Sequence, residues 1–189
     1  MKINPFSILP DASKTIVQYQ KGQYLFHQFD TVHSVYVLIS GRVQMQKTLE
    51  DGHTVVIHEA LVQESFAEAA LFSECYHCDC VSLSRSTVMK ISKTAVLQAI
   101  SDNPKFGESL IKMLSHQVQH YRQRLKIASI NSAHQKVLTA LSCELHYTKI
   151  TELADSIGLS HEACYRALSS LVKEGKLNKL GRGRYELNR

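Results

Sequence analysis

The first half of the chain alternates short apolar runs with turn signals. Runs rich in β-branched and aromatic residues are typical of strands, and they occupy residues 18–26, 34–39, 42–48 and 54–60. Glycine-containing dipeptides punctuate them at Lys21-Gly22, Ser40-Gly41 and Asp51-Gly52. Asp-Gly is favoured in tight hairpins because both residues tolerate positive φ. From about residue 15 to residue 91 the pattern therefore predicts an antiparallel β-barrel or jelly roll.

A helical pattern replaces the strand pattern after residue 92. Residues 93–101 form a short predicted helix, and Asn103-Pro104 opens a long one, with Asn103 as the N-cap and Pro104 in the first turn. Within the long helix, apolar residues recur at spacings of three and four, which defines a heptad seam. The residues of this seam are Ile111, Leu114, Val118, Tyr121, Leu125 and Ala128.

The seam is narrow, because the positions beside it between His116 and Lys126 are polar or charged. A narrow apolar seam is typical of a two-stranded coiled coil. We therefore expect a parallel homodimer that pairs through this helix. The alternative is that the same stripe covers the β-barrel of its own chain.

The last third of the chain combines helical patterns with a basic hairpin. The predicted helices occupy residues 131–144, 150–157 and 161–174, and the predicted strands occupy 176–180 and 184–187. Gly158-Leu159-Ser160 forms the turn before the last helix, which Ser160 caps and Gly175 ends. A helix, a tight turn, a capped helix and a hairpin with Arg182 at its tip indicate a winged helix-turn-helix.

Composition and charge divide the chain in a similar way. Its 189 residues, 44% hydrophobic and 21% charged, suffice for two small domains. Residues 1–111 contain 9 Lys and Arg against 11 Asp and Glu, whereas residues 112–189 contain 13 against 6. This balance favours a polyanionic partner for the C-terminal half. We predict an α+β protein with a sensor domain at 1–102, a dimerisation helix at 103–130 and a DNA-binding domain at 131–189.

Other classes of protein lack their signatures in this sequence. There is no apolar run of the ~20 residues that cross a bilayer, and residues 1–10 lack the basic start and apolar core of a signal peptide. We expect a cytoplasmic protein with no membrane partner, whose 5 cysteines are reduced. Nucleophile elbows, phosphate-cradling glycine loops and the histidine pairs of jelly-roll oxygenases are also missing, so we predict no enzymatic activity.

The second helix of a helix-turn-helix enters the major groove, where its first two turns contact base edges. The residues predicted to be exposed there are His161, Glu162, Tyr165 and Arg166. Glu162 and Arg166 are the predicted base readers, because Glu accepts from cytosine and Arg binds guanine bidentately. Alternatively, Glu162 forms a salt bridge with Arg166. Contacts to sugar and phosphate are expected from Ser160, His161, Lys173, Lys179, Arg182 and Arg184.

Three motifs resemble the Crp/Fnr family of regulators, and the resemblance covers nearly the whole chain. Residues 21–26 (KGQYLF) and 35–43 (VYVLISGRV) are similar to the family's barrel signature, and residues 68–72 (EAALF) to its ligand cassette. Ser160-His161-Glu162 with Arg166 is similar to its recognition helix, with His161 in place of the usual Arg. The resemblance implies a cyclic-nucleotide-binding-like barrel, a dimerising central helix, palindromic operators in double-stranded DNA, and contact with RNA polymerase.

The cassette departs from the nucleotide-binding pattern of this family. Ala67 stands where the family has glycine, and Cys78-Asp79 where it has the Arg-Ser pair that binds phosphate. An aspartate repels phosphate, so we do not expect cyclic AMP to be the effector. An iron–sulfur cluster of the Fnr kind is not expected either, because that branch uses clustered N-terminal cysteines and the first cysteine here is Cys75.

The cassette contains thiols and metal-ligating side chains instead. The predicted effector pocket consists of Glu68, His77, Cys78, Asp79 and Cys80, and all of these except Asp79 are candidate metal ligands. Cys, His and carboxylate bind zinc and other transition metals, and neighbouring thiols undergo redox chemistry. One interpretation is metal or thiol-redox sensing; the other is that these cysteines are buried or incidental. A different function, also left open, is a cyclic-nucleotide-responsive sensor that acts through a protein partner.

Overall fold

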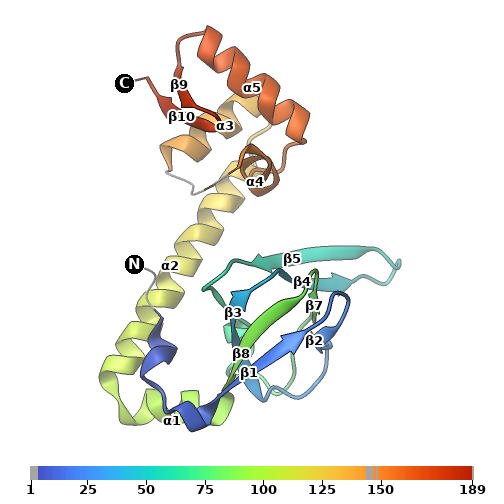
Figure 1. Cartoon of the computed structure of the whole chain (residues 1–189), viewed down its shortest axis with the longest axis vertical. Coiled ribbons are helices and arrows are strands. Elements are labelled where there is room, and N and C mark those ends of the chain that lie inside the picture. Colours follow the sequence, from blue (N-terminus) through green and yellow to red (C-terminus); the bar gives the residue numbers. More distant parts are fainter. Residues whose placement is uncertain (1–3, 144–146, 148, 189) are drawn as a thin grey trace. The chain divides into compact units, whose positions relative to one another are not determined.

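The computed structural model describes residues 4–143, 147 and 149–188. The chain divides into two compact units, Met1–Met113 and Leu114–Arg189. The first unit contains two four-stranded sheets, and the second contains helices α3 to α5 and a two-stranded hairpin (Figure 1). The division falls within helix α2, Pro104–Ala128. The domain boundaries that we placed after residues 102 and 130 stay predictions.

The first unit is built mainly from strands. They are β1 (Lys14–Tyr19), β2 (Tyr24–Phe26), β3 (Ser34–Ser40), β4 (Val43–Thr48), β5 (Thr54–Ala60), β6 (Ser65–Phe66), β7 (Asp79–Ser82) and β8 (Ser86–Ser92). Short 3-10 helices occupy η1 (Pro5–Ile8), η2 (Asp11–Ser13) and η3 (Glu68–Ala70), and helix α1 (Lys93–Asp102) follows β8.

The strands form two antiparallel sheets, ordered β1-β8-β3-β6 and β2-β7-β4-β5. Side chains from both sheets share one hydrophobic core. The fold is therefore a β-sandwich with the strand order of a jelly roll, which is one of the two forms predicted, and the sheets do not close into a barrel. The edge strands β1 and β6 of one sheet do not pair with the edge strands β2 and β5 of the other.

The strand boundaries predicted from the sequence are accurate where a predicted apolar run corresponds to a single strand. Strand β5 matches the predicted run at residues 54–60, and β3 and β4 differ from their predicted runs by one residue each. The run at 18–26 instead contains the end of β1 and the whole of β2, which lie in different sheets.

Gly41, in the turn between β3 and β4, is packed against the backbone of a distant turn. Its φ is +92°, and a Cβ atom there would lie 2.3 Å from the Ser86 hydroxyl oxygen and 2.5 Å from the Arg85 carbonyl oxygen. Only glycine fits both this conformation and this approach.

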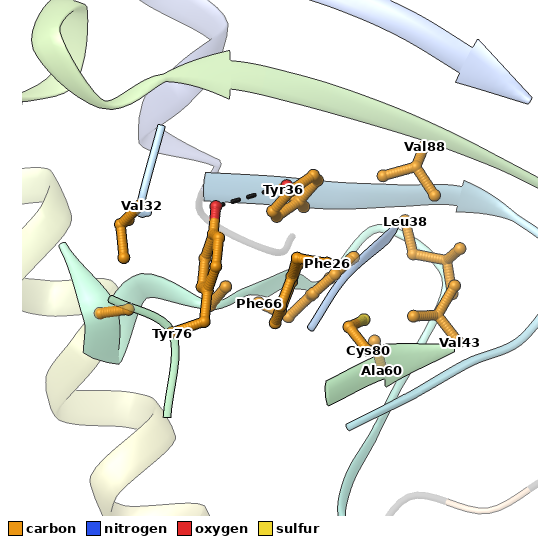
Figure 2. Close-up of a cluster of buried hydrophobic side chains, with 12 residues drawn as sticks. Phe26, Val32, Tyr36, Leu38, Val43, Ala60, Phe66, Tyr76, Cys80 and Val88 are labelled. Carbon is orange, nitrogen blue, oxygen red and sulfur yellow. Dashed lines mark hydrogen bonds between the residues drawn. The ribbon is translucent and has the colours of Figure 1, made fainter. Parts of the chain in front are cut away.

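The core of the sandwich is dominated by stacked aromatic rings (Figure 2). The ring of Phe26 lies 3.8 Å from that of Tyr76 and 5.4 Å from that of Tyr36, which in turn lies 5.3 Å from Phe66. The Tyr76 hydroxyl donates to the Ser34 carbonyl oxygen (2.7 Å), and the two tyrosine hydroxyl oxygens are 3.3 Å apart. The buried hydroxyls are thus hydrogen-bonded, which makes their burial affordable.

Helices α1 and α2 begin at the capping residues that local sequence indicates. The Ser92 hydroxyl accepts from the Ala95 amide at 3.4 Å, and Oδ1 of Asn103 accepts from the Phe106 amide at 3.1 Å. Pro104 is the first residue of α2, as predicted. No described helix is long and apolar enough to span a membrane.

The second unit packs its helices around a separate core. Its elements are α3 (Ala133–Ser142), α4 (Ile150–Ser156), α5 (His161–Lys173), β9 (Leu177–Gly181) and β10 (Arg184–Leu187). Ile127 of α2 joins Val137, Leu153, Leu168 and Leu171 in that core. Helix α3 begins two residues later than the predicted Asn131, because Ser132 is its N-cap, and the predicted end at Glu144 lies outside the described residues.

Candidate nucleic-acid interface and sensor cassette

A tight turn positions α5 after α4. Gly158 has φ +64°, which suits glycine, and the Ser160 hydroxyl accepts from the Ala163 amide at 3.2 Å. The apolar face of α5 is buried in the core, and Cys164 and Leu168 on it are fully covered. This packing fixes which residues of α5 face outward.

The predicted DNA-contacting residues of α5 lie on its exposed side. Ser160, His161, Glu162, Tyr165 and Arg166 are all exposed. The Arg166 guanidinium and the Glu162 carboxylate are 3.8 Å apart, and both side chains are more than 70% exposed. Such an exposed ion pair is weak, so either group can exchange its partner for a base edge or a phosphate.

His161 has a partner that the sequence did not indicate. Its Nε2 lies 3.1 Å from Oδ1 of Asp155, the penultimate residue of α4. The contact joins α4 and α5, the two helices on either side of the turn. His161 therefore helps to hold the turn, in addition to the sugar or phosphate contact predicted for it.

A cleft of about 990 Å³ lies between the first turn of α4, the second half of α5 and the hairpin. Its charged and hydroxyl-bearing lining includes the predicted Lys173, Lys179 and Arg182, and also Lys149, Thr151 and Ser169. Arg184 is exposed on β10 beside it. Sequence reasoning missed Lys149, Thr151 and Ser169, because no local pattern links residues that come from two separate helices.

The start of the cassette, at β6 and η3, is held by contacts within the first unit. The Ser65 hydroxyl donates to Oε1 of Glu68 and lies 3.3 Å from the Met113 sulfur in α2. Ala67, at the position where the family has glycine, adopts a left-handed conformation with φ +66°. Ala67 thus adopts the left-handed conformation that glycine favours.

Two other members of the predicted effector pocket have structural partners. Oδ1 of Asp79 accepts from the Gln28 amide at 2.8 Å and lies 3.5 Å from Nδ1 of His27. His77 is exposed, and its Nε2 lies 2.9 Å from the Ser73 hydroxyl oxygen. Asp79 therefore closes the loop after β2, which gives this carboxylate a structural explanation.

The two cysteines of the predicted pocket are not activated thiols. Burial raises the pKa of the Cys78 thiol, and the neighbouring Asp79 raises it further. Burial also raises the pKa of Cys80, which is fully covered in the sandwich core. Both thiols are therefore protonated at neutral pH and are poor nucleophiles.

The four candidate metal ligands lie in different surroundings: Cys80 in the core, Cys78 half-buried, His77 exposed and Glu68 against Ser65. Within the described part of the chain, no group of three or more His, Cys, Asp or Glu side chains is placed to hold a metal ion. The metal site thus stays a prediction from composition.

The predicted dimerisation seam is exposed along α2. Ile111 and Leu125 are 65% and 70% exposed, and Val118 and Tyr121 are also among the exposed large hydrophobic residues. Ala128 is exposed and Leu114 is half-buried. Ile111 belongs to the same unit as the sandwich and is not covered by it, and whether the rest of the stripe forms a dimer seam stays a prediction.

Known proteins resemble this chain in both sequence and fold. The cyclic nucleotide-binding domain family matches residues 16–103. The cyclic AMP receptor protein of Thermus thermophilus is 25% identical over 177 residues, which cover 89% of this chain and 82% of that protein.

Solved structures extend the likeness to the C-terminal half. DNR from Pseudomonas aeruginosa is 25% identical, with a TM-score of 0.54 over 94% of this chain and 84% of that one. FixK2 from Bradyrhizobium japonicum shares the fold, with a TM-score of 0.62 over 93% of each chain and 19% identity. Residues 16–103 thus match the cyclic nucleotide-binding domain, and the comparisons taken together support a regulator of the Crp/Fnr family.

Proposed function

We propose that this protein is a homodimeric transcription regulator that binds palindromic operators in double-stranded DNA through a winged helix-turn-helix. The observation that carries the proposal is the exposed face of α5, where a capped helix presents His161, Glu162 and Arg166. Side chains of these types discriminate base pairs by hydrogen bonds in the major groove. The hairpin β9–β10 supplies the wing, with Arg182 and Arg184 exposed on it.

The dimer rests on the seam of α2. An exposed apolar stripe of this length is costly on a monomer, and a second copy of the same helix would cover it. Pairing along a two-fold axis would place two α5 helices for matched half-sites about one DNA turn apart. This is the arrangement that palindromic operators require.

For the effector, we propose that cyclic AMP is not bound. The pair that would meet its phosphate is Cys78-Asp79, which offers no cation, and the Asp79 carboxylate is engaged by Gln28 and His27. Metal or thiol-redox sensing by the cassette stays open as an alternative, as does a regulator that binds DNA without any effector. In either case we propose a regulatory activity, with RNA polymerase as a protein partner at the promoter.

Operator selection tests the proposal. The full-length protein would be incubated with fragmented genomic DNA, and the retained fragments sequenced and compared for a palindromic motif. Arg166→Gln is expected to lose about 1–3 kcal/mol of discrimination at one base pair of each half-site. Lys176→Gln is the matched control, because Lys176 is an exposed cation beyond the end of α5, next to Glu174.

Retention of unrelated fragments with equal efficiency would contradict the proposal. That outcome would favour the alternative function, a sensor that acts through a protein partner and uses its basic C-terminal half as an interface. Equal discrimination by wild type and Arg166→Gln would instead remove Arg166 from the base readers.

A further inference from the structure

Helix α2 contains two exposed histidines that lie one helical turn apart. His116 and His120 are four positions apart in sequence, and the helix is continuous from Pro104 to Ala128. Side chains at i and i+4 lie on the same face of a helix, with Cβ atoms about 5–6 Å apart. Both imidazoles can therefore reach a common ligand.

Most histidines of this chain are engaged in contacts with other side chains. Imidazoles that lie within 3.7 Å of a carboxylate or hydroxyl oxygen belong to His27, His53, His58, His77, His134 and His161. His116 and His120 are different, because neither imidazole forms a hydrogen bond or an ion pair with another residue in the described part of the chain. Each neutral imidazole therefore retains a nitrogen lone pair for a ligand.

The pair lies on the side of α2 away from the predicted dimerisation seam. With 3.6 residues per turn, His116 and His120 point roughly opposite to the seam. A dimer paired through the seam would leave them accessible, so each chain would present its own pair. The nearest cation one turn earlier is Lys112, whose Nζ lies 2.6 Å from Oε1 of Glu108. That carboxylate offsets part of the repulsion between Lys112 and a bound cation.

Two imidazoles at this spacing are suitable ligands for a transition metal. The same i, i+4 spacing supplies two zinc ligands in the H-E-x-x-H motif, and metal–nitrogen bonds of about 2.0–2.1 Å fit between side chains one turn apart. Imidazole suits nickel, copper and zinc, whereas carboxylate and water suit magnesium and calcium. Among the described residues no third His, Cys, Asp or Glu completes a metal-binding group, so water would fill the remaining positions.

We propose that His116 and His120 bind one divalent cation of the late first-row series, Ni²⁺, Cu²⁺ or Zn²⁺, in each chain. The site is separate from the cassette and does not depend on the proposed DNA binding. It follows shortly after Met113, where the chain divides into its two units, and precedes Ile127, which α2 contributes to the second core. Only the helical form holds both imidazoles on one face, so the metal stabilises this part of α2 as a helix.

Calorimetric titration of the metal-free, full-length protein with Ni²⁺ tests the site. Ni²⁺ is the probe because thiolates, which the cassette cysteines could supply, favour Cu⁺ and zinc. Binding of one Ni²⁺ per chain is expected. Two linked ligands bind about 10²–10⁴-fold more tightly than either alone, so His116→Gln and His120→Gln are each expected to raise the dissociation constant by about 100-fold or more.

His33→Gln is the matched control. His33 is also exposed and has no imidazole partner in the described part of the chain, but no histidine lies three or four residues from it. Its replacement is expected to leave the dissociation constant unchanged. Adding Lys112→His to His120→Gln recreates an i, i+4 pair with His116 one turn earlier, and it is expected to restore most of the lost affinity.

Absence of nickel binding by the wild type would overturn the proposal. Equal affinities of the wild type, His116→Gln and His120→Gln would also overturn it, because they indicate an adventitious ion only. Loss of binding in Cys78→Ser with unchanged binding in His116→Gln would assign the metal to the cassette instead. Should a variant unfold, labelling of the wild type with diethyl pyrocarbonate replaces it. Ni²⁺ is expected to protect His116 and His120 and to leave His33 reactive, and equal labelling with and without Ni²⁺ contradicts the site.

Metal binding also predicts a change in stability. The melting temperature of the wild type is expected to rise with Ni²⁺ concentration, and that of His120→Gln is expected to rise less at the same concentrations. Operator selection is a separate measurement on the same protein. A chain that binds Ni²⁺ through this pair and selects no operator keeps the metal site and loses the regulator, whereas a chain that selects an operator and ignores Ni²⁺ does the reverse.

Discussion

Individual residues of this chain adopt backbone conformations that their side chains disfavour. Phe29, Gln63 and Ala67 have positive φ values of 71°, 66° and 66°. A left-handed conformation costs a non-glycine residue roughly 1–2 kcal/mol, so tertiary contacts must impose it. For Gln63 one such contact is the hydrogen bond from its amide to the Leu38 carbonyl oxygen, at 2.7 Å.

Gly41 is the residue whose replacement is expected to be most damaging. In Gly41→Ala the methyl group meets the Arg85 carbonyl and the Ser86 Cα, at 2.5 and 2.6 Å, in addition to the left-handed strain. We expect a loss of roughly 2–5 kcal/mol in the free energy of unfolding, measured by urea denaturation. Gly52→Ala is the control: its φ is +83° but its Cβ would meet nothing within 4 Å, so it is expected to lose only roughly 1–2 kcal/mol. Equal losses in the two variants would refute the steric argument.

At the scale of elements, α2 has two differently exposed stripes. Phe106, Leu110 and Ile127 are buried, whereas Ile111, Val118 and Leu125 are not. The buried residues belong to the compact units of the chain itself. We propose that the exposed stripe binds another molecule.

Leu125→Glu tests whether that molecule is a second copy. Each dimer would lose two buried leucine side chains, at roughly 1.5–3 kcal/mol each, so the dissociation constant is expected to rise by about 100-fold or more. Sedimentation equilibrium measures this constant directly. Leu180→Glu, at a residue that is 61% exposed on β9 and away from the seam, is expected to leave it unchanged. A wild-type monomer, or equal constants in both variants, would contradict the coiled-coil dimer.

Capping residues in the sequence predicted where helices begin, because capping depends on contacts between neighbouring residues. Asn103 and Ser160, both predicted as caps, mark the starts of their helices because a cap acts within three residues. The sequence left open whether the sheets form a barrel or a jelly roll, and it joined β1 and β2 in one run at 18–26, since strand pairing depends on distant partners.

Contacts between residues distant in sequence also limited what could be predicted about the candidate site. Asp79 is predicted to belong to an effector pocket, and the structure adds that its carboxylate accepts a hydrogen bond from the amide of Gln28, 51 residues away in sequence. The exposed positions of the predicted base readers on α5 follow from helical periodicity, whereas the cleft lined by residues of α4, α5 and the hairpin depends on how these elements pack. No window of sequence contains that information.

At the scale of the whole molecule, regulation requires the cassette and the DNA-binding unit to share an equilibrium. An effector shifts that equilibrium only if it binds one state better than the other. Under the proposal that Asp79 stands where a phosphate would need a cation, we expect cyclic AMP to have no such preference.

We therefore expect cyclic AMP to leave both the melting temperature and the affinity for a selected operator unchanged. A ligand present at 100 times its dissociation constant would stabilise the folded state by about 2.7 kcal/mol, which a thermal melt detects easily. A melting temperature that rises with nucleotide concentration would refute this expectation. The same operator assay with a chelator or a mild oxidant decides between the two interpretations of the cassette cysteines.

The stacked aromatic core also makes the sandwich visible to optical spectroscopy without a label. The chain contains no tryptophan, so its 8 tyrosines dominate the near-ultraviolet absorption. Tyr36 and Tyr76 are buried, stacked and hydrogen-bonded, and a fixed asymmetric environment of this kind gives tyrosine a strong circular dichroism signal. Burial also raises the pKa of Tyr36, so its ring resists ionisation in an alkaline titration while the sandwich is intact. Loss of the dichroism and appearance of the tyrosinate band would therefore record the melting of the β-sandwich within the full-length protein.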